Sequence, residues 1–81
     1  MVDYAKITDL TNAIVEEYEY TMDRIADASN KILELQAERR TAKTRRQRRE
    51  IDSAIQIEHM RRQSLYARRD VLAYLREVAQ V

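Results

Sequence analysis

The fold is decided at residues 39–49, which read Arg-Arg-Thr-Ala-Lys-Thr-Arg-Arg-Gln-Arg-Arg (RRTAKTRRQRR). The apolar pattern that recurs along the rest of the chain lapses here, between Leu35 and Ile51. Within the gap, Thr44 is followed three residues later by Gln47. This Ser/Thr-x-x-Glu/Gln spacing is the capping-box pattern with which helices begin. We therefore expect a short turn over residues 41–44 between two helices.

Before this stretch, apolar side chains repeat at helical spacing. An ideal helix advances about 100° per residue, which places these side chains on one stripe and most of the acidic residues opposite it. The pattern predicts an amphipathic helix over about residues 3–40. Its candidate core or oligomer-interface residues are Ile7, Leu10, Ile14, Tyr18, Ile25, Ile32 and Leu35.

A second apolar stripe follows residue 50. Positions 57, 60, 64, 67, 71, 74 and 78 are alternately three and four residues apart, as in the seam of a coiled coil. The pattern predicts a second helix over about residues 45–80, with Ile51 and Ile55 off the stripe. The candidate core or oligomer-interface residues of this helix are Ile57, Met60, Val71, Leu75 and Val78.

The composition indicates an all-α fold. The chain has 81 residues and contains neither Gly nor Pro, the residues on which most turns between strands depend. We expect a single domain folded as an antiparallel, coiled-coil-like helical hairpin. Because no Gly is present to end the first helix, two alternatives stay open. One is an unbroken helix of about 75 residues, and the other is a break at Ser29–Asn30.

The apolar stripes favour self-association. Two helices that touch along one line bury only part of each stripe, and small single cores barely offset the cost of ordering the chain. We therefore expect a homodimer, most simply two hairpins that form a four-helix bundle.

Charge is distributed unevenly along the chain, although the formal net charge is only +1. Residues 1–38 carry nine acidic and three basic side chains, a net charge of −6. Residues 39–81 carry five acidic and twelve basic side chains, a net charge of +7. This division indicates halves that attract each other, a partner of one sign, or both.

Seven basic side chains crowd into the stretch that contains the expected turn. Arginine binds phosphate and carboxylate through two parallel hydrogen bonds and keeps its charge at any accessible pH. The stretch is therefore a candidate nucleic-acid or anion site, with an acidic protein partner or a solvated tip as alternatives. The candidate binding residues are Arg39, Arg40, Lys43, Arg45, Arg46, Arg48 and Arg49.

Two further groups of side chains on the helices bear on partners. Arginines continue along the second helix, and we expect them to pair with the acidic first helix rather than to form a basic stripe along a duplex. They are Arg61, Arg62, Arg68, Arg69 and Arg76. On the first helix, an exposed tyrosine among acids is a candidate protein-binding patch, made of Glu16, Glu19, Tyr20 and Asp23.

No catalytic constellation is present in the sequence. His59 is the single histidine, cysteine is absent, and no glycine loop exists to cradle a phosphate. We therefore expect no enzymatic activity, no metal, no cofactor and no small-molecule substrate. Because the N-terminus lacks a signal-peptide pattern and no apolar run reaches the length of a membrane span, we expect a soluble cytoplasmic protein.

The leading hypothesis is a small, non-enzymatic accessory or regulatory protein that self-associates and binds nucleic acid through its arginine-rich bend. Contacts to the backbone are expected, because no base-reading motif is present. The alternative is a protein–protein adaptor, inhibitor or assembly factor, such as a phage- or plasmid-borne one, that docks its helix faces on a larger partner. A purely structural coiled-coil oligomer is the second alternative.

Overall fold

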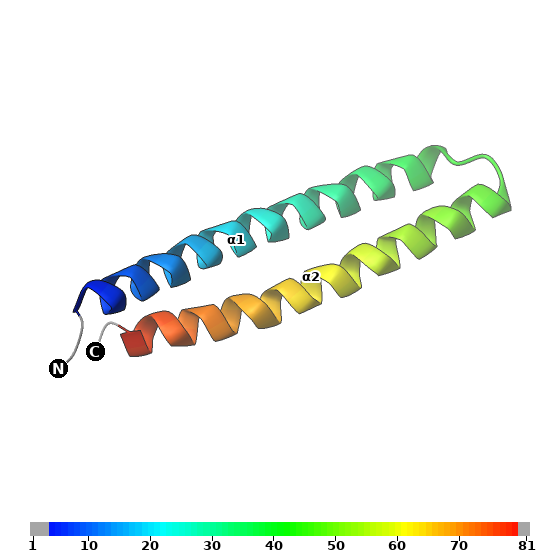
Figure 1. The fold of residues 1–81 in the computed structure, drawn as a ribbon. Helices are drawn as coiled ribbons and strands as arrows, with labels where there is room; N and C mark the ends of the chain where they lie inside the picture. Colours follow the sequence, from blue (N-terminus) through cyan, green and yellow to red (C-terminus); the bar gives the residue numbers. More distant parts are fainter. Residues whose placement is uncertain (1–3, 80–81) are drawn as a thin grey trace.

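The computed structural model describes residues 4–79 as two long α-helices joined by a tight turn (Figure 1). Helix α1 spans Tyr4–Thr41 and helix α2 spans Arg45–Ala79. The helices lie antiparallel, side by side, in a rod whose Cα atoms extend over 67 Å by 14 Å by 14 Å. The predicted all-α helical hairpin is confirmed. Neither the unbroken helix nor a break at Ser29–Asn30 occurs, since α1 continues through both residues.

The turn is made by a capping box. Thr44 Oγ1 accepts a hydrogen bond from the Gln47 amide at 3.1 Å. In return, Gln47 Oε1 accepts from the amides of Thr44 at 3.3 Å and Lys43 at 3.1 Å. These bonds satisfy backbone donors that the start of a helix leaves without an intrahelical partner. None of the described residues has a positive φ, so the chain reverses without needing glycine.

The core of the hairpin is a single row of side chains on α1. The buried apolar residues among those described are Ile25, Ala28, Ile32 and Leu35. Thr21 is buried on the same row and its hydroxyl donates to the carbonyl oxygen of Glu17 at 2.7 Å, so no polar group is left unpaired there.

The other predicted core residues of α1 are less covered. Ile14 and Tyr18 are half-buried, near the open end of the hairpin. Leu10 is exposed, so it does not pack in the core between the helices, and as a residue of an oligomer interface it stays a prediction. Ile7 lies outside the residues whose side chains the structure describes.

The structure corrects the predicted core of α2. Ile57, Met60, Val71, Leu75 and Val78 are all exposed, so none of them packs in the core between the two helices. As residues of an oligomer interface they stay a prediction. No residue within Arg45–Ala79 is fully buried.

The side of α2 that faces α1 is a different one. Its half-buried apolar residues include Ile51, Ile55, Leu65 and Leu72, the first two of which lie off the predicted stripe. At about 100° per residue, this side is opposite the heptad stripe. Helix α2 therefore carries apolar residues on both of its sides, and the hairpin uses the side that the heptad spacing does not mark.

Within residues 4–79, no helix has a stretch that is both long and apolar enough to cross a membrane.

Removing the capping box should destabilise the hairpin. We expect Gln47→Ala to lower the free energy of unfolding by about 1 kcal/mol, the usual cost of losing a helix cap. Gln56→Ala is the matched control, because Gln56 is exposed on α2 away from the cap. Urea denaturation followed by circular dichroism measures both variants. Equal stabilities of the two variants would contradict a structural role for the capping box.

A pair of leucines tests the packing side of α1. Leu35 is 7% exposed and Leu33 is 63% exposed. We expect Leu35→Ala to cost about 2–4 kcal/mol, because it opens a cavity in the core, and Leu33→Ala to cost under about 1 kcal/mol. Thermal and urea denaturation of both variants give the comparison. A larger loss for Leu33→Ala would show that α1 is rotated from the orientation described.

Candidate nucleic-acid interface

The seven predicted basic residues gather at the end of the hairpin that contains the turn (Figure 1). Arg39 and Arg40 end α1, Lys43 lies in the turn, and the other four arginines occupy the first five residues of α2. All seven side chains are exposed. We refer to this group as the arginine bend.

Two members of the arginine bend have a carboxylate partner. Arg39 binds Asp52 across the helices through two hydrogen bonds, Nε to Oδ1 at 2.6 Å and Nη2 to Oδ2 at 3.4 Å. The hydrogen bond, with the charge of Asp52, raises the pKa of Arg39 above its ordinary value. Arg46 pairs with Glu50 one turn further along α2, Nε to Oε1 at 3.3 Å, where both side chains are largely exposed.

The other five members have no carboxylate partner within the described part of the chain. They are Arg40, Lys43, Arg45, Arg48 and Arg49. Of the nearby acids, Glu50 is paired with Arg46, Glu34 lies by Lys31 at 3.8 Å, and Glu38 is exposed and leaves one carboxylate for the five bases. The hairpin therefore carries an excess of positive charge at this end that its own acids do not neutralise.

The helix dipoles act differently on the two sides of the bend. Arg39 and Arg40 lie at the C-terminal end of α1, where the dipole favours positive charge. Arg45 and Arg46 lie in the first turn of α2, where the dipole disfavours it. The start of α2 is thus the part of the bend that gains most from an external anion.

Of the five remaining arginines, Arg61 and Arg69 pair with Glu58 and Asp70 of their own helix. The expected pairing with the acidic helix is found for Arg68, whose Nη2 lies 2.8 Å from Glu17 Oε2. Arg62 instead donates to Ser29 Oγ at 3.2 Å, and Arg76 lies over the ring of Tyr18 at 5.9 Å. Arg62, Arg68 and Arg76 therefore contribute to helix–helix contact, so these arginines do not form a continuous basic stripe.

Tyr66 is a contact that the sequence analysis missed. Two guanidinium groups lie over the ring of this half-buried residue, that of Arg69 at 4.8 Å and that of Arg62 at 5.9 Å from the ring centre. The spacing of these residues, four and three apart, places them on one helix face. That spacing is the signal by which this cluster is recognisable.

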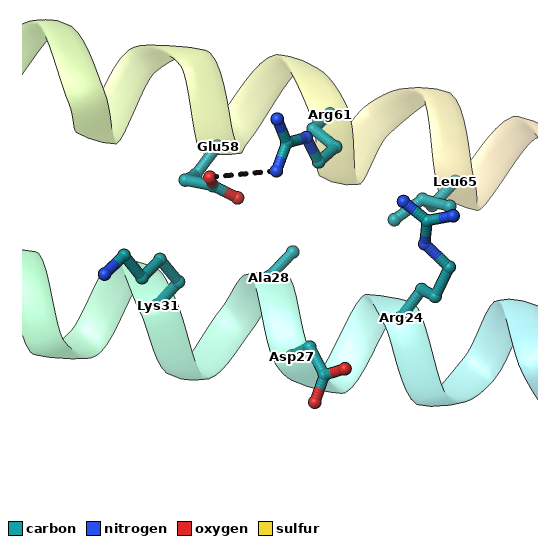
Figure 2. Close-up of a pocket in the computed structure, with 7 residues that line it drawn as sticks. All are labelled: Arg24, Asp27, Ala28, Lys31, Glu58, Arg61 and Leu65. Atoms are coloured by element: carbon teal, nitrogen blue, oxygen red, sulfur yellow. Dashed lines mark hydrogen bonds and ion pairs between the residues drawn. The ribbon is translucent and has the colours of Figure 1, made fainter.

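A hollow of about 350 Å³ lies between the helices at mid-length (Figure 2). At this point the short side chain of Ala28 is directed from α1 toward α2. Glu58, whose side chain is 14% exposed, pairs there with Arg61 of its own helix at 3.2 Å. The charged groups around it are largely matched, with three bases and two acids among the lining residues. These are Arg24, Asp27, Ala28, Lys31, Glu58, Arg61 and Leu65.

The predicted protein-binding patch lies on α1. Glu16, Glu19, Tyr20 and Asp23 are all exposed. Tyr20, which is 56% exposed, accepts a hydrogen bond from Arg24 Nη1 at 3.4 Å, and the Arg24 guanidinium lies 5.6 Å from the centre of its ring. By helical spacing the patch points away from the core row of α1.

No group of three potential metal ligands occurs within residues 4–79. In comparisons with known proteins, no family model matches the chain, and neither the curated proteins nor the solved structures contain a significant match.

Two arginines of the bend should have opposite effects on stability. We expect Arg45→Gln to raise the thermal midpoint at low salt by a few degrees, because a dipole interaction of about 0.3–1 kcal/mol is relieved. Arg39→Gln, the control, should lower the midpoint, because it breaks the pair with Asp52. Circular dichroism melts at low and high salt measure both effects, and the gain from Arg45→Gln should shrink at high salt. Shifts in the same direction would contradict the assignment.

Proposed function

We propose that this protein is a non-enzymatic accessory protein that self-associates and binds nucleic acid through the arginine bend. The observation that carries the proposal is the excess of positive charge there. Five of the seven basic side chains have no carboxylate partner in the described chain. They lie at one end of the rod, where two helix ends and the turn bring them together.

Phosphate is the anion that suits this arrangement. Each guanidinium group presents a planar pair of donors that fits a phosphate through two hydrogen bonds. Several such groups close together match a polymer that carries a charge on each nucleotide. Neutralising each phosphate releases condensed counterions, which makes binding favourable at low salt.

The shape of the bend favours contact with the backbone of the nucleic acid. The Cα atoms of the hairpin already extend over 14 Å in cross-section, before any side chain is added. The major groove of B-DNA is about 12 Å wide and admits one helix. An end-on hairpin is too broad to enter it, so its arginines meet phosphates at the rim and sequence preference is weak.

Self-association forms part of the proposal. The buried apolar core consists of four side chains on α1 among the described residues, which is small against the entropy that two long helices lose on folding. A second hairpin would cover further apolar surface and form a four-helix assembly. It would also place two arginine bends on one particle, which strengthens binding to a polymer through a higher effective concentration.

A second candidate function is docking onto a larger protein as an adaptor, inhibitor or assembly factor. The observation that favours it is the acidic patch around Tyr20, whose members are all exposed on one side of α1. Exposed tyrosines are frequent anchors at interfaces. Charge complementarity would supply the orientation and the association rate toward a basic partner.

A salt titration tests the nucleic-acid proposal. Fluorescence anisotropy measures binding of the wild type to duplex DNA, single-stranded DNA and RNA as the salt concentration rises. If the five unpaired bases each neutralise one phosphate, the log–log slope for duplex DNA is about −4 to −5. In the test variant four residues are changed to Gln together: Arg45, Arg46, Arg48 and Arg49. Three of the five unpaired bases are lost in it, so its slope should fall to about −2.

The control variant changes the same four arginines to Lys. Because charge is retained, this variant should keep most of the salt dependence, with weaker binding from the loss of paired hydrogen bonds. Circular dichroism checks that both variants remain helical. A wild type that binds no nucleic acid at low salt would refute the proposal and transfer support to the adaptor function.

A further inference from the structure

The largest apolar surface of α2 is on its outer side. The exposed apolar residues there form the outer stripe, which consists of Ile57, Met60, Ala67, Val71, Tyr74, Leu75 and Val78. Val71, near the middle of this side, is 58% exposed. The outer stripe extends along more than half of α2 and lies opposite the side that contacts α1.

The spacing of the outer stripe is suited to a helical partner. Its positions 57, 60, 64, 67, 71, 74 and 78 keep the alternating three–four interval of a coiled-coil seam. Such a seam receives side chains from a facing helix that has the same interval. Helix α1 does not serve this purpose, because it packs on the opposite side of α2.

A second copy of the chain fits the outer stripe better than a charged partner does. No seam position from Ile57 to Val78 carries a charge, so the surface is complementary to itself. Ser64 and Ala67 lie near its middle, where small side chains let two helices approach closely. Six large side chains, each 41–65% exposed, offer on the order of 600 Å² per copy. Two copies would bury about 1,200 Å², at the lower end of stable interfaces.

We infer that two copies dock through the outer stripe, α2 against α2, which deepens the self-association included in the proposed function. The four helices then lie in a row, in the order α1, α2, α2 and α1. A square four-helix bundle would need the apolar surfaces of both helices on one flank of the hairpin. In the row, the acidic side of α1 stays outside and the arginine bends remain accessible.

Sedimentation equilibrium over the micromolar range tests the docking surface. The wild type should have twice the mass of one chain. Val71→Glu should give the mass of a single chain, because a charge in an apolar seam opposes docking. Leu33→Glu is the matched control, since Leu33 is also exposed but lies on α1, and it should remain a dimer. Both residues are exposed in the hairpin, so neither substitution disturbs its core, and circular dichroism checks that both variants remain helical at the concentrations used.

Spin labels test the order of the helices. The chain has no cysteine, so Ala67→Cys or Leu33→Cys introduces a single labelling site. In the row, the labels at Ala67 of the two copies lie one helix spacing apart, about 10 Å between axes. The labels at Leu33 lie three spacings apart, about 25–30 Å. Electron paramagnetic resonance distances distinguish these, and a shorter distance at Leu33 than at Ala67 would overturn the row.

The outcomes separate this inference from the proposed function. A wild type that stays monomeric, even one that binds lipid vesicles through the outer stripe, would overturn docking between copies. So would a dimer that Leu33→Glu disrupts and Val71→Glu leaves intact.

The Val71→Glu monomer keeps its arginine bend, so it should bind nucleic acid with an unchanged salt slope per chain and lower overall affinity. A dimer that binds no nucleic acid would refute the function alone.

Discussion

The reversal of the chain at Thr44 and Gln47 is the constraint on which the other features depend. Reciprocal hydrogen bonds between these residues cap the start of α2, and the turn divides the chain almost evenly. Because the turn is short, the helices must lie antiparallel and in contact along their length. The same turn brings basic residues of both helices to one end of the rod. Without it, the same basic residues would surround the middle of one long helix instead of gathering at the end of the rod.

The two helices contribute unequally to the packing. Helix α1 presents one apolar row, which α2 covers, so the buried residues among those described all belong to α1. Helix α2 presents a mixed side, in which Leu65 and Leu72 alternate with the stems and rings of Arg62, Tyr66 and Arg69. Long side chains of this kind bury their stems while their charged groups reach water. The contact between α1 and α2 therefore includes few apolar side chains from α2.

Three chemically distinct surfaces result from this arrangement. The outer side of α1 is acidic, the outer side of α2 is apolar, and the end that contains the turn is basic. The charge difference between the two halves of the sequence is neutralised only in small part across the contact between α1 and α2, where Arg68 pairs with Glu17. The ion pair between Arg39 and Asp52 runs in the opposite direction, with the base on α1. Most of the charge therefore remains on the surface, where partners of either sign meet it.

The sequence by itself determined the helices and the turn, because helical spacing and the capping box are local properties. The absence of glycine and proline, the pattern of α1 and the Thr44–Gln47 pair were enough to predict the hairpin. The composition of the arginine bend was equally readable from a run of eleven residues. The members that lack a carboxylate partner could be identified only from the folded geometry, because Asp52 reaches Arg39 only across the turn.

Only the tertiary structure decided which side of α2 faces α1. Helix α2 carries apolar residues on two opposite sides, and periodicity alone ranks the heptad stripe of Ile57 and Val71 above the side of Ile55 and Leu65. The choice between them depends on how each side fits the row of small and branched side chains on α1. That fit is a property of two surfaces in contact, and no single helix encodes it.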